Sequence, residues 1–546
     1  MTFSTLRALH AVIGAAIDDI ERVYHDRSPQ GNPMEYPSLD EPYYHTAQHT
    51  PEEELSEALK GDPAVAAASK RIVAACGQLA TTVNKPWYGL MEDVQRGQFS
   101  SAIRFLETAN IVEILREAGP GGLHVREIHR LILEMRANLK TAAPADTSPL
   151  TPAHISRILR LLATGHYLRE MTPDVFANNR ASSYIDTGKT VSQLREAPEK
   201  KYNDTDGVAA YLALSGDKAL KCMSCLTEWA LPEEPLIDRT ETNFDCYCAP
   251  RPELEGQSPT QASAGAIARH GAPFNLAFNT QLGYFPWLEL PENEGRFVRF
   301  GHGMTGTRQS EIKNQILQGF PWEELPQGSV LVDVGGGIGA QSILVAEAYP
   351  HIHVVVEDRE QVVSTAVSAW GPQYAHLFES GRMSWGTRDF FEAWPALTLP
   401  DIGPVGTPAV FLLRHVLHNW RDEDCKRHVL LRSMLTRLRA AAGPHTKLLI
   451  GDMLLPNACA DEAAYEGADG SAEKFPFVTK DSPLLPNLGV ANLHGYLMDI
   501  LMMGLFDAKE RTVDEMTALA FVAGWKIVEI RRTPGSMWAY TTAVPV

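Results

Sequence analysis

The chain has 546 residues, 44 % of them hydrophobic and 21 % charged, with a formal net charge of −18. This length predicts at least two domains, and the acidic balance argues against nucleic acid or anionic membranes as partners. No apolar run approaches the roughly 20 residues that cross a bilayer. Seven cysteines, an odd number in a long chain, do not suggest a disulfide framework, so we expect a reduced, cytoplasmic protein.

The first 300 residues have a mainly helical pattern. Residues 27–50 contain four prolines and many polar side chains, which predicts an extended linker. Thr50, Pro51 and Glu53 then supply an N-cap hydroxyl, a proline at the first helical position and a capping-box glutamate. Helical periodicity resumes over residues 64–82 and 100–118. We therefore expect residues 1–300 to form a helical N-terminal region.

Residues 125–184 predict two helices followed by a small hairpin, the order of a winged-helix unit over about 95–190. Such a unit either binds DNA or serves as a packing and dimerisation module. The second helix, 154–162, carries only Arg157 and Arg160 as basic residues, which favours packing.

Residues 230–272 are rich in proline, glutamate, serine and glycine and predict a long polar insertion. Four cysteines lie in or near it, namely Cys222, Cys225, Cys246 and Cys248. Their grouping leaves a zinc site open as an alternative to isolated thiols.

The second half of the chain follows a different pattern. Short apolar segments that predict strands alternate with helical segments, and this order is typical of a doubly wound parallel sheet. The strands are expected at 329–334, 353–356, 409–413 and 447–450, and the helices at 340–348 and 422–442. We therefore expect an α/β, Rossmann-like domain over residues 301–546, with its ligand at the carboxyl ends of the strands.

A glycine cluster after the first of these strands indicates a cofactor site. Gly335, Gly337 and Gly339 allow a sharp strand-to-helix turn on which a ligand can lie. Asp358 ends the next strand and can accept hydrogen bonds from ribose hydroxyls. Dinucleotide folds use the spacing G-x-G-x-x-G and bring phosphate to the helix N-terminus. Asp333 would repel phosphate but attract an ammonium group, which favours S-adenosylmethionine.

These motifs, together with several further ones in the same order, resemble the plant and fungal small-molecule O-methyltransferases, above all the fungal branch. The resemblance is close over residues 275–546 and looser over 95–190. Its motifs are Val332-Asp333-Val334-Gly335-Gly336-Gly337, Asp358, Asp389-Phe390, Arg414 to Asp422, Asp452 and Lys509-Glu510-Arg511-Thr512.

The resemblance implies a role for each matching residue. His418, just beyond a strand end, would be the general base, oriented by Glu510 and by Asp452, where plant members have glutamate. Further residues would bind the cofactor: Asp358 on the ribose, Asp389 and Phe390 near the adenine, and Arg414 near the methionine end. The scheme requires no metal, and the sequence indicates no cluster of histidine, aspartate and glutamate that would bind one.

The acceptor would be a small aromatic compound, and a histidine base favours a phenolic hydroxyl. Candidate pocket residues are Asn275, Phe278, Met304 and Met502, and a long irregular loop over 456–492 follows Asp452. Relatives of this type are generally homodimers through their N-terminal helices, so we expect the same here. Two alternatives remain: a noncatalytic binding protein with this fold, and a nucleotide-dependent oxidoreductase, which the glycine spacing and Asp333 oppose.

Overall fold

The structure is a computed structural model. It describes residues 2–29, 34–137, 149–231, 271–307, 314–370, 373–394, 397–399, 403–421, 430–459, 464–466, 472–474, 478, 481–532 and 536–546. The chain forms two compact units, one of Met1–Ile20, Gly61–Val83 and Ile312–Val546, the other of Glu21–Lys60 and Asn84–Glu311. Among the described residues, no helix combines the length and apolar character needed to span a membrane.

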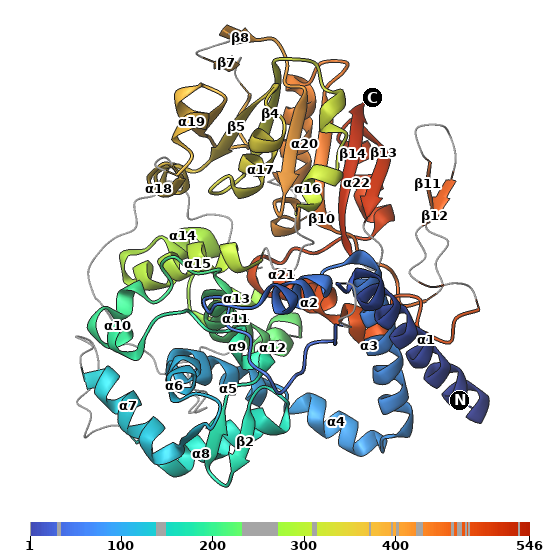
Figure 1. The fold of residues 1–546 in the computed structure, drawn as a ribbon. Coiled ribbons are helices and arrows are strands. Elements are labelled where there is room, and N and C mark those ends of the chain that lie inside the picture. Colours follow the sequence, from blue (N-terminus) through green and yellow to red (C-terminus); the bar gives the residue numbers. More distant parts are fainter. Residues whose placement is uncertain are drawn as a thin grey trace. The chain divides into compact units, whose positions relative to one another are not determined.

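The first unit is built on a seven-stranded sheet of order β13-β14-β10-β9-β4-β5-β6 (Figure 1). Strands β10, β9, β4, β5 and β6 run parallel, and β14 pairs antiparallel with both β10 and β13. The strands are β4 (Ser329–Val334), β5 (Ile352–Asp358), β6 (Met383–Thr387), β9 (Val410–Arg414), β10 (Lys447–Met453), β13 (Trp525–Arg532) and β14 (Trp538–Pro545). This is the mostly parallel sheet that the alternating pattern predicts.

Side chains of the central strands alternate between two hydrophobic clusters. Val330, Val332 and Val334 of β4 belong to one cluster and Leu331 to the other. Because successive side chains of a strand point to opposite faces, these clusters form cores on the two sides of the sheet.

Helices supply the outer layers of both cores. Helices α20 (Leu430–Ala441) and α22 (Val513–Val522) contribute to the first cluster, and α16 (Gln315–Gln318) and α17 (Ala340–Ala348) to the second. The remaining elements of this half are η5 (Trp322–Glu324), α18 (Glu360–Trp370), α19 (Ala375–Glu379), β7 (Leu397–Leu399), β8 (Gly403–Val405), η6 (Leu417–Asn419), β11 (Ala464–Glu466), β12 (Ala472–Lys474), η7 (Gly489–Asn492) and α21 (Leu493–Phe506). Of the helix expected at 422–442, residues 422–429 lie outside the described part.

Two N-terminal segments pack with this unit, although they come from the part of the chain assigned by sequence to the N-terminal region. Leu9 of α1 (Phe3–Arg27) and Ala75 of α3 (Pro63–Val83) share a hydrophobic cluster with Leu484 and Leu488. Gln78 also donates a hydrogen bond of 2.8 Å to the carbonyl of Pro483. Part of the loop expected at 456–492 is thus held by N-terminal helices.

The second unit is mainly helical. Its helices are α2 (Pro51–Leu59), α4 (Pro86–Val94), α5 (Gly97–Thr108), α6 (Ile111–Ala118), α7 (Val125–Ala137), α8 (Pro152–Thr164), α9 (Arg180–Ser183), α10 (Val191–Glu196), η2 (Pro198–Lys200), α11 (Val208–Met223), α12 (Leu226–Ala230), α13 (Pro273–Ala277), α14 (Tyr284–Leu288), η3 (Pro291–Asn293) and α15 (Glu294–Gly306). The periodicity over 100–118 comes from two helices, α5 and α6, because Asn110 between them has φ = 55° and breaks the run.

Helices α7 and α8 precede a hairpin, as expected from the sequence. Strands β2 (Arg169–Thr172) and β3 (Val175–Ala177) form it, and β1 (Leu123–His124) completes a sheet of order β1-β3-β2. Thr151 caps α8, accepting the backbone N–H of His154 at 3.3 Å. Most of the insertion expected over 230–272, with Cys246 and Cys248, lies outside the described residues. Cys222 is buried and Cys225 is partly exposed.

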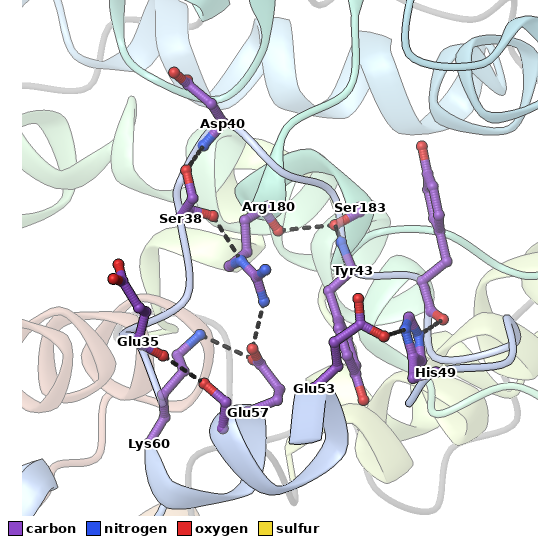
Figure 2. Close-up of polar contacts among 12 residues, drawn as sticks. Glu35, Ser38, Asp40, Tyr43, His49, Glu53, Glu57, Lys60, Arg180 and Ser183 are labelled. Carbon is purple, nitrogen blue, oxygen red and sulfur yellow. Dashed lines mark hydrogen bonds and ion pairs between the residues drawn. The ribbon is translucent and has the colours of Figure 1, made fainter. Parts of the chain in front are cut away.

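The segment 34–50 has no helix or strand and contains two turns, consistent with the predicted linker. Figure 2 shows its main anchor, Arg180, whose Nε donates to the carbonyl of Ser38 at 2.8 Å and whose guanidinium pairs with Glu57. Tyr43 stacks on the ring of His49 with 3.9 Å between ring centroids. The segment ends at the predicted capping box, in which Thr50 and Glu53 bond reciprocally.

Candidate active site

The glycine turn after β4 has the backbone that its sequence predicts. Gly335, Gly337 and Gly339 have φ of 69°, 60° and 76°, values that side chains disfavour. A Cβ at Gly336 would lie 2.4 Å from the carboxyl carbon of Asp333. The turn therefore lies directly against the Asp333 carboxylate and has no room for a side chain there.

Asp333 is a buried acid with one unused oxygen. Its Oδ2 accepts the hydroxyl of Ser342 at 2.6 Å, whereas Oδ1 has no hydrogen-bond partner. Burial raises the pKa of Asp333 to about 7, an effect that the Ser342 hydrogen bond opposes. A cation beside Oδ1 would offset the cost of burying this charge, so the residue fits the ammonium group of S-adenosylmethionine.

Asp358 connects the glycine turn to the end of β5. One carboxylate oxygen accepts the N–H of Gly337 at 2.8 Å and the other accepts the N–H of Arg359 at 2.7 Å. Since each carboxylate oxygen has two acceptor sites, Asp358 can still receive ribose hydroxyls. Its position fits that role.

The residues expected near the adenine follow β6. Asp389 is exposed, and its carboxylate accepts the N–H of Phe391 at 2.9 Å. The Phe390 ring lies 3.7 Å from where a Cβ on Gly335 would stand. An apolar ring therefore borders the glycine turn, as an adenine site requires.

Arg414 ends β9 on the same edge of the sheet. Its guanidinium lies over the ring of Trp538 at 5.2 Å from the centroid. The next residues turn back toward the glycine loop, because a Cβ on Gly335 would lie 3.0 Å from Cγ2 of Val416. The β9 turn and the cofactor turn are thus in contact, two residues before His418.

His418 is buried and held by a carboxylate. Its Nδ1 lies 2.7 Å from Oε1 of Glu510, a residue 92 positions away in sequence. Burial lowers the pKa of His418, but the charge and hydrogen bond of Glu510, together with the charge of Asp452, outweigh burial, so the pKa lies above 6.5. With Nδ1 bonded to Glu510, Nε2 is the nitrogen available to a ligand.

Asp452 has a different position from the one expected. Both acids were expected to orient His418, but Asp452 Oδ1 accepts the backbone N–H of His415 at 3.1 Å, and no hydrogen bond between Asp452 and His418 is found among the described residues. His415 has φ = 53°, so this bond stabilises a conformation that side chains disfavour. Asp452 therefore shapes the turn that carries His418 and acts on the ring through its charge. Burial raises the pKa of Asp452 to about 7.

Each residue of the Lys509 to Thr512 motif has its own contact. Lys509 pairs with Glu515 at 2.7 Å, and Thr512 forms a capping box with Glu515 at the start of α22. Arg511 is buried and donates to the carbonyls of Leu417 (3.0 Å) and Trp420 (2.9 Å). Arg511 thereby fixes the turn that carries His418, a role the sequence analysis did not assign.

The predicted pocket residues have mixed surroundings. The Asn275 side-chain amide forms hydrogen bonds with neighbouring backbone groups. Its Nδ2 donates to the carbonyls of Thr280 and Leu282, and its Oδ1 accepts the N–H of Ala272. Phe278 packs against Trp287 with 4.7 Å between centroids. Met304 is 37 % exposed, and Met502 is buried on α21. Their contact with an acceptor stays a prediction.

His415 is a second histidine close to His418, and it was not predicted from the sequence as a site residue. Its ring centroid lies 5.1 Å from that of His418 and 4.5 Å from that of Trp538. His415, His418 and Asp452 each have one potential metal-ligand atom, a ring nitrogen or a carboxylate oxygen, and these three atoms lie within 4.8 Å of one another. The sequence indicated no cluster of histidine, aspartate and glutamate, because residues that follow two different strands do not reveal from sequence that their side chains converge.

Comparisons with known proteins indicate the family of the chain. The O-methyltransferase domain family matches residues 264–470. An O-methyltransferase of Armillaria gallica is 32 % identical over 550 residues, covering all of both chains. The 4-O-methyltransferase 1 of Phanerochaete chrysosporium is 32 % identical and covers 97 % of this chain and 96 % of its own.

Solved structures share the fold. The mitomycin 7-O-methyltransferase MmcR, 18 % identical, aligns over 84 % of this chain and 98 % of its own with a TM-score of 0.54. The complex of LepI with SAM, 16 % identical, aligns over 90 % of this chain and 100 % of its own with a TM-score of 0.58. The fold is that of a Rossmann-like methyltransferase domain with a helical N-terminal region. The chain belongs to the fungal O-methyltransferase family.

Proposed function

We propose that this chain is an S-adenosylmethionine-dependent O-methyltransferase that methylates a phenolic hydroxyl of a small aromatic compound. His418 is the general base. The main observation behind this proposal is the buried His418–Glu510 pair, because His418 lies on a turn that contacts the glycine loop. S-adenosylmethionine as cofactor is supported by the unpartnered Asp333 Oδ1, the glycine backbone and the placement of Asp358.

The residues have separate tasks in this proposal. Asp333 receives the ammonium group, Asp358 the ribose, and Phe390 borders the adenine. When bound, S-adenosylmethionine supplies an electrophilic methyl group on a positively charged sulfur. Methyl transfer is an in-line displacement, so holding the acceptor oxygen in line supplies much of the rate.

His418 makes the acceptor nucleophilic. The phenolic proton passes to Nε2 as the oxygen takes the methyl group, and Glu510 stabilises the resulting imidazolium through Nδ1. A phenol of pKa ~10 exceeds an imidazole of ~6.5 by about 3.5 units, a gap of roughly 5 kcal/mol. The raised pKa of His418 narrows this gap. Aliphatic alcohols, nearer the ~15.7 of water, would leave a far wider one.

The first experiment compares acceptors. Purified chain is incubated with S-adenosylmethionine and a panel of phenols, beside benzyl alcohols with the same ring substituents, and products are read by the mass of one added methyl group. We expect methylation of phenols only. Binding of the cofactor without transfer to any acceptor would support the noncatalytic alternative, and preferential binding of NADH would support the oxidoreductase.

The second experiment tests the base. We expect His418→Ala to lose turnover while its affinity for S-adenosylmethionine stays within a few fold. Loss of cofactor binding with normal turnover at saturation would contradict the assignment.

A homodimer is also part of this proposal. Helix α4 has no buried residue and exposes Trp87 (67 %), Leu90 (64 %) and Val94 (77 %). A cluster of exposed apolar side chains on one helix is typical of an interaction surface. We assign it to a second copy of this chain, in keeping with the expected pairing through N-terminal helices.

A further inference from the structure

Three side chains at the sheet edge form a potential set of metal ligands. His415 and His418 follow β9, and Asp452 lies near the end of β10, so the parallel pairing of these strands brings them together. One ligand atom from each lies within 4.8 Å of the others. Two imidazoles and one carboxylate form a common set of protein ligands for divalent transition metals.

One of the two histidines makes the outer contact that is typical of metal ligands. A metal-bound histidine nearly always donates its second ring N–H to a carboxylate or carbonyl, and His418 Nδ1 has this relationship with Glu510. The remaining nitrogen, Nε2, is the one that would coordinate. Glu510 thus serves as the outer partner of the site.

Asp452 supplies a buried oxygen for the third position. Its Oδ1 accepts the N–H of His415, whereas Oδ2 is buried and has no hydrogen-bond partner. An unused carboxylate oxygen in a protein interior is costly unless a donor or cation meets it. A metal ion at this position would satisfy that oxygen.

The ligand types select which metals can bind. Zn²⁺ holds nitrogen and oxygen ligands at about 2.0–2.2 Å in a tetrahedron, which puts neighbouring ligand atoms roughly 3.4 Å apart. The ligand atoms here lie at most 4.8 Å apart, so metal binding requires side-chain rotations that bring them closer by up to about 1.4 Å. Mg²⁺ and Ca²⁺ prefer oxygen ligands, whereas this set offers two imidazole nitrogens and one carboxylate.

We propose that His415, His418 and Asp452 bind one divalent transition-metal ion of the Zn²⁺ type, and that this ion blocks the histidine base. The metal site itself does not depend on the proposed function, whereas the block of methyl transfer rests on it. An ion on Nε2 of His418 occupies the lone pair that would receive the acceptor proton. The metal therefore inhibits the enzyme.

Co²⁺ is the probe, because its visible absorption reports tetrahedral coordination without any assay of activity. The full chain, freed of metal by a chelator, is titrated with Co²⁺ and then with Zn²⁺ as competitor. We expect one Co²⁺ per chain, displaced by Zn²⁺ and not by Mg²⁺. Absence of saturable binding, or Co²⁺ displaced equally by Mg²⁺, would overturn the site.

Two variants remove ligands with little change of shape. His415→Asn keeps a residue that tolerates positive φ, and Asp452→Asn keeps an oxygen for the His415 N–H. Each should weaken Co²⁺ binding by more than the roughly 10–100-fold typical of losing an outer partner. His376→Ala removes an exposed histidine that pairs with Glu347, and it should bind Co²⁺ as the unmodified chain does.

Circular dichroism and thermal melting show whether the variants fold. Unchanged Co²⁺ affinity in both folded ligand variants would refute the ligand set. If a variant unfolds, Glu510→Gln gives a second test, since losing the outer carboxylate should weaken Co²⁺ by about 10–100-fold. Where Co²⁺ binds but no phenol is methylated, the site stands and the proposed function fails. Methylation unaffected by bound Zn²⁺ would refute the block.

Discussion

The Nδ1 atom of His418 and the Oε1 atom of Glu510 lie 2.7 Å apart inside the protein. Since Glu510 raises the pKa of His418 above 6.5, His418 binds a proton, and is lost as a base, when the pH falls through that raised value. Activity should therefore fall on the acid side with an apparent pKa above 6.5.

Glu510→Gln removes the charge that causes this shift. We expect the acid limb of kcat/KM to move to lower pH and the maximal rate to fall about 10²–10⁴-fold, the usual contribution of a positioned acid–base group. The measurement is a pH–rate profile with a chelator present throughout. An acid limb at the same pH in both proteins would mean that another group sets it.

Arg511 offers a test of the turn that carries His418. In Arg511→Lys a single ammonium group replaces the guanidinium, and it cannot donate to the carbonyls of both Leu417 and Trp420 as the two guanidinium nitrogens do. We expect kcat to fall at least tenfold while the dissociation constant for S-adenosylmethionine, measured by calorimetry, changes little. Lys509→Gln is the matched control, because its pair with Glu515 is partly exposed and contributes about 0–1 kcal/mol. Equal effects of the two variants would show that Arg511 has no special positioning role.

Helix α4 gives a prediction about assembly. We expect the unmodified chain to sediment as a dimer and the double variant Leu90→Glu/Val94→Glu as a monomer, because two charges would enter an apolar contact. Phe521→Glu changes another exposed apolar residue (64 %) on α22 and should leave the dimer intact. A monomeric unmodified chain, or a dimeric double variant, contradicts the assignment of this surface.

The sequence predicted the parts of the site that depend on strand ends and motif order. His418 and Asp358 could be chosen because parallel strands present their carboxyl ends at one edge, whereas Glu510 could be chosen only from its motif in the family resemblance. It could not predict the direction of the Asp452 side chain, because a position at a strand end leaves open which neighbour its carboxylate contacts. The role of His415 was missed for a related reason: its N–H donates to the Asp452 carboxylate and to the Gly451 carbonyl, contacts that the local sequence pattern does not show.

Gly336 tests the cofactor turn. Gly336→Ala would put a methyl group 2.4 Å from the Asp333 carboxyl carbon, so the turn must move. We expect at least a tenfold loss of affinity for S-adenosylmethionine, measured by calorimetry. Gly406→Ala is the control, because a Cβ there meets nothing within 4 Å. Unchanged affinity in Gly336→Ala would place the cofactor elsewhere.

Asp333 predicts how stability depends on pH. Its pKa in the folded chain, about 7, lies above the ordinary value of 3.8. The carboxyl is protonated in both folded and unfolded chains below about pH 4. As the pH rises toward 7, the unfolded chain ionises at this carboxyl more readily than the folded chain does, so the folded chain loses stability.

Asp333→Asn tests this dependence, because Asn cannot ionise. The melting temperature of Asp333→Asn minus that of the unmodified chain should increase between pH 5 and pH 8. The corresponding free energy is a few kcal/mol at most, at about 1.4 kcal/mol per pKa unit. Asp389→Asn changes an exposed acid and should show a flat difference. A flat difference for Asp333→Asn as well would mean that this carboxyl is already ionised in the folded chain.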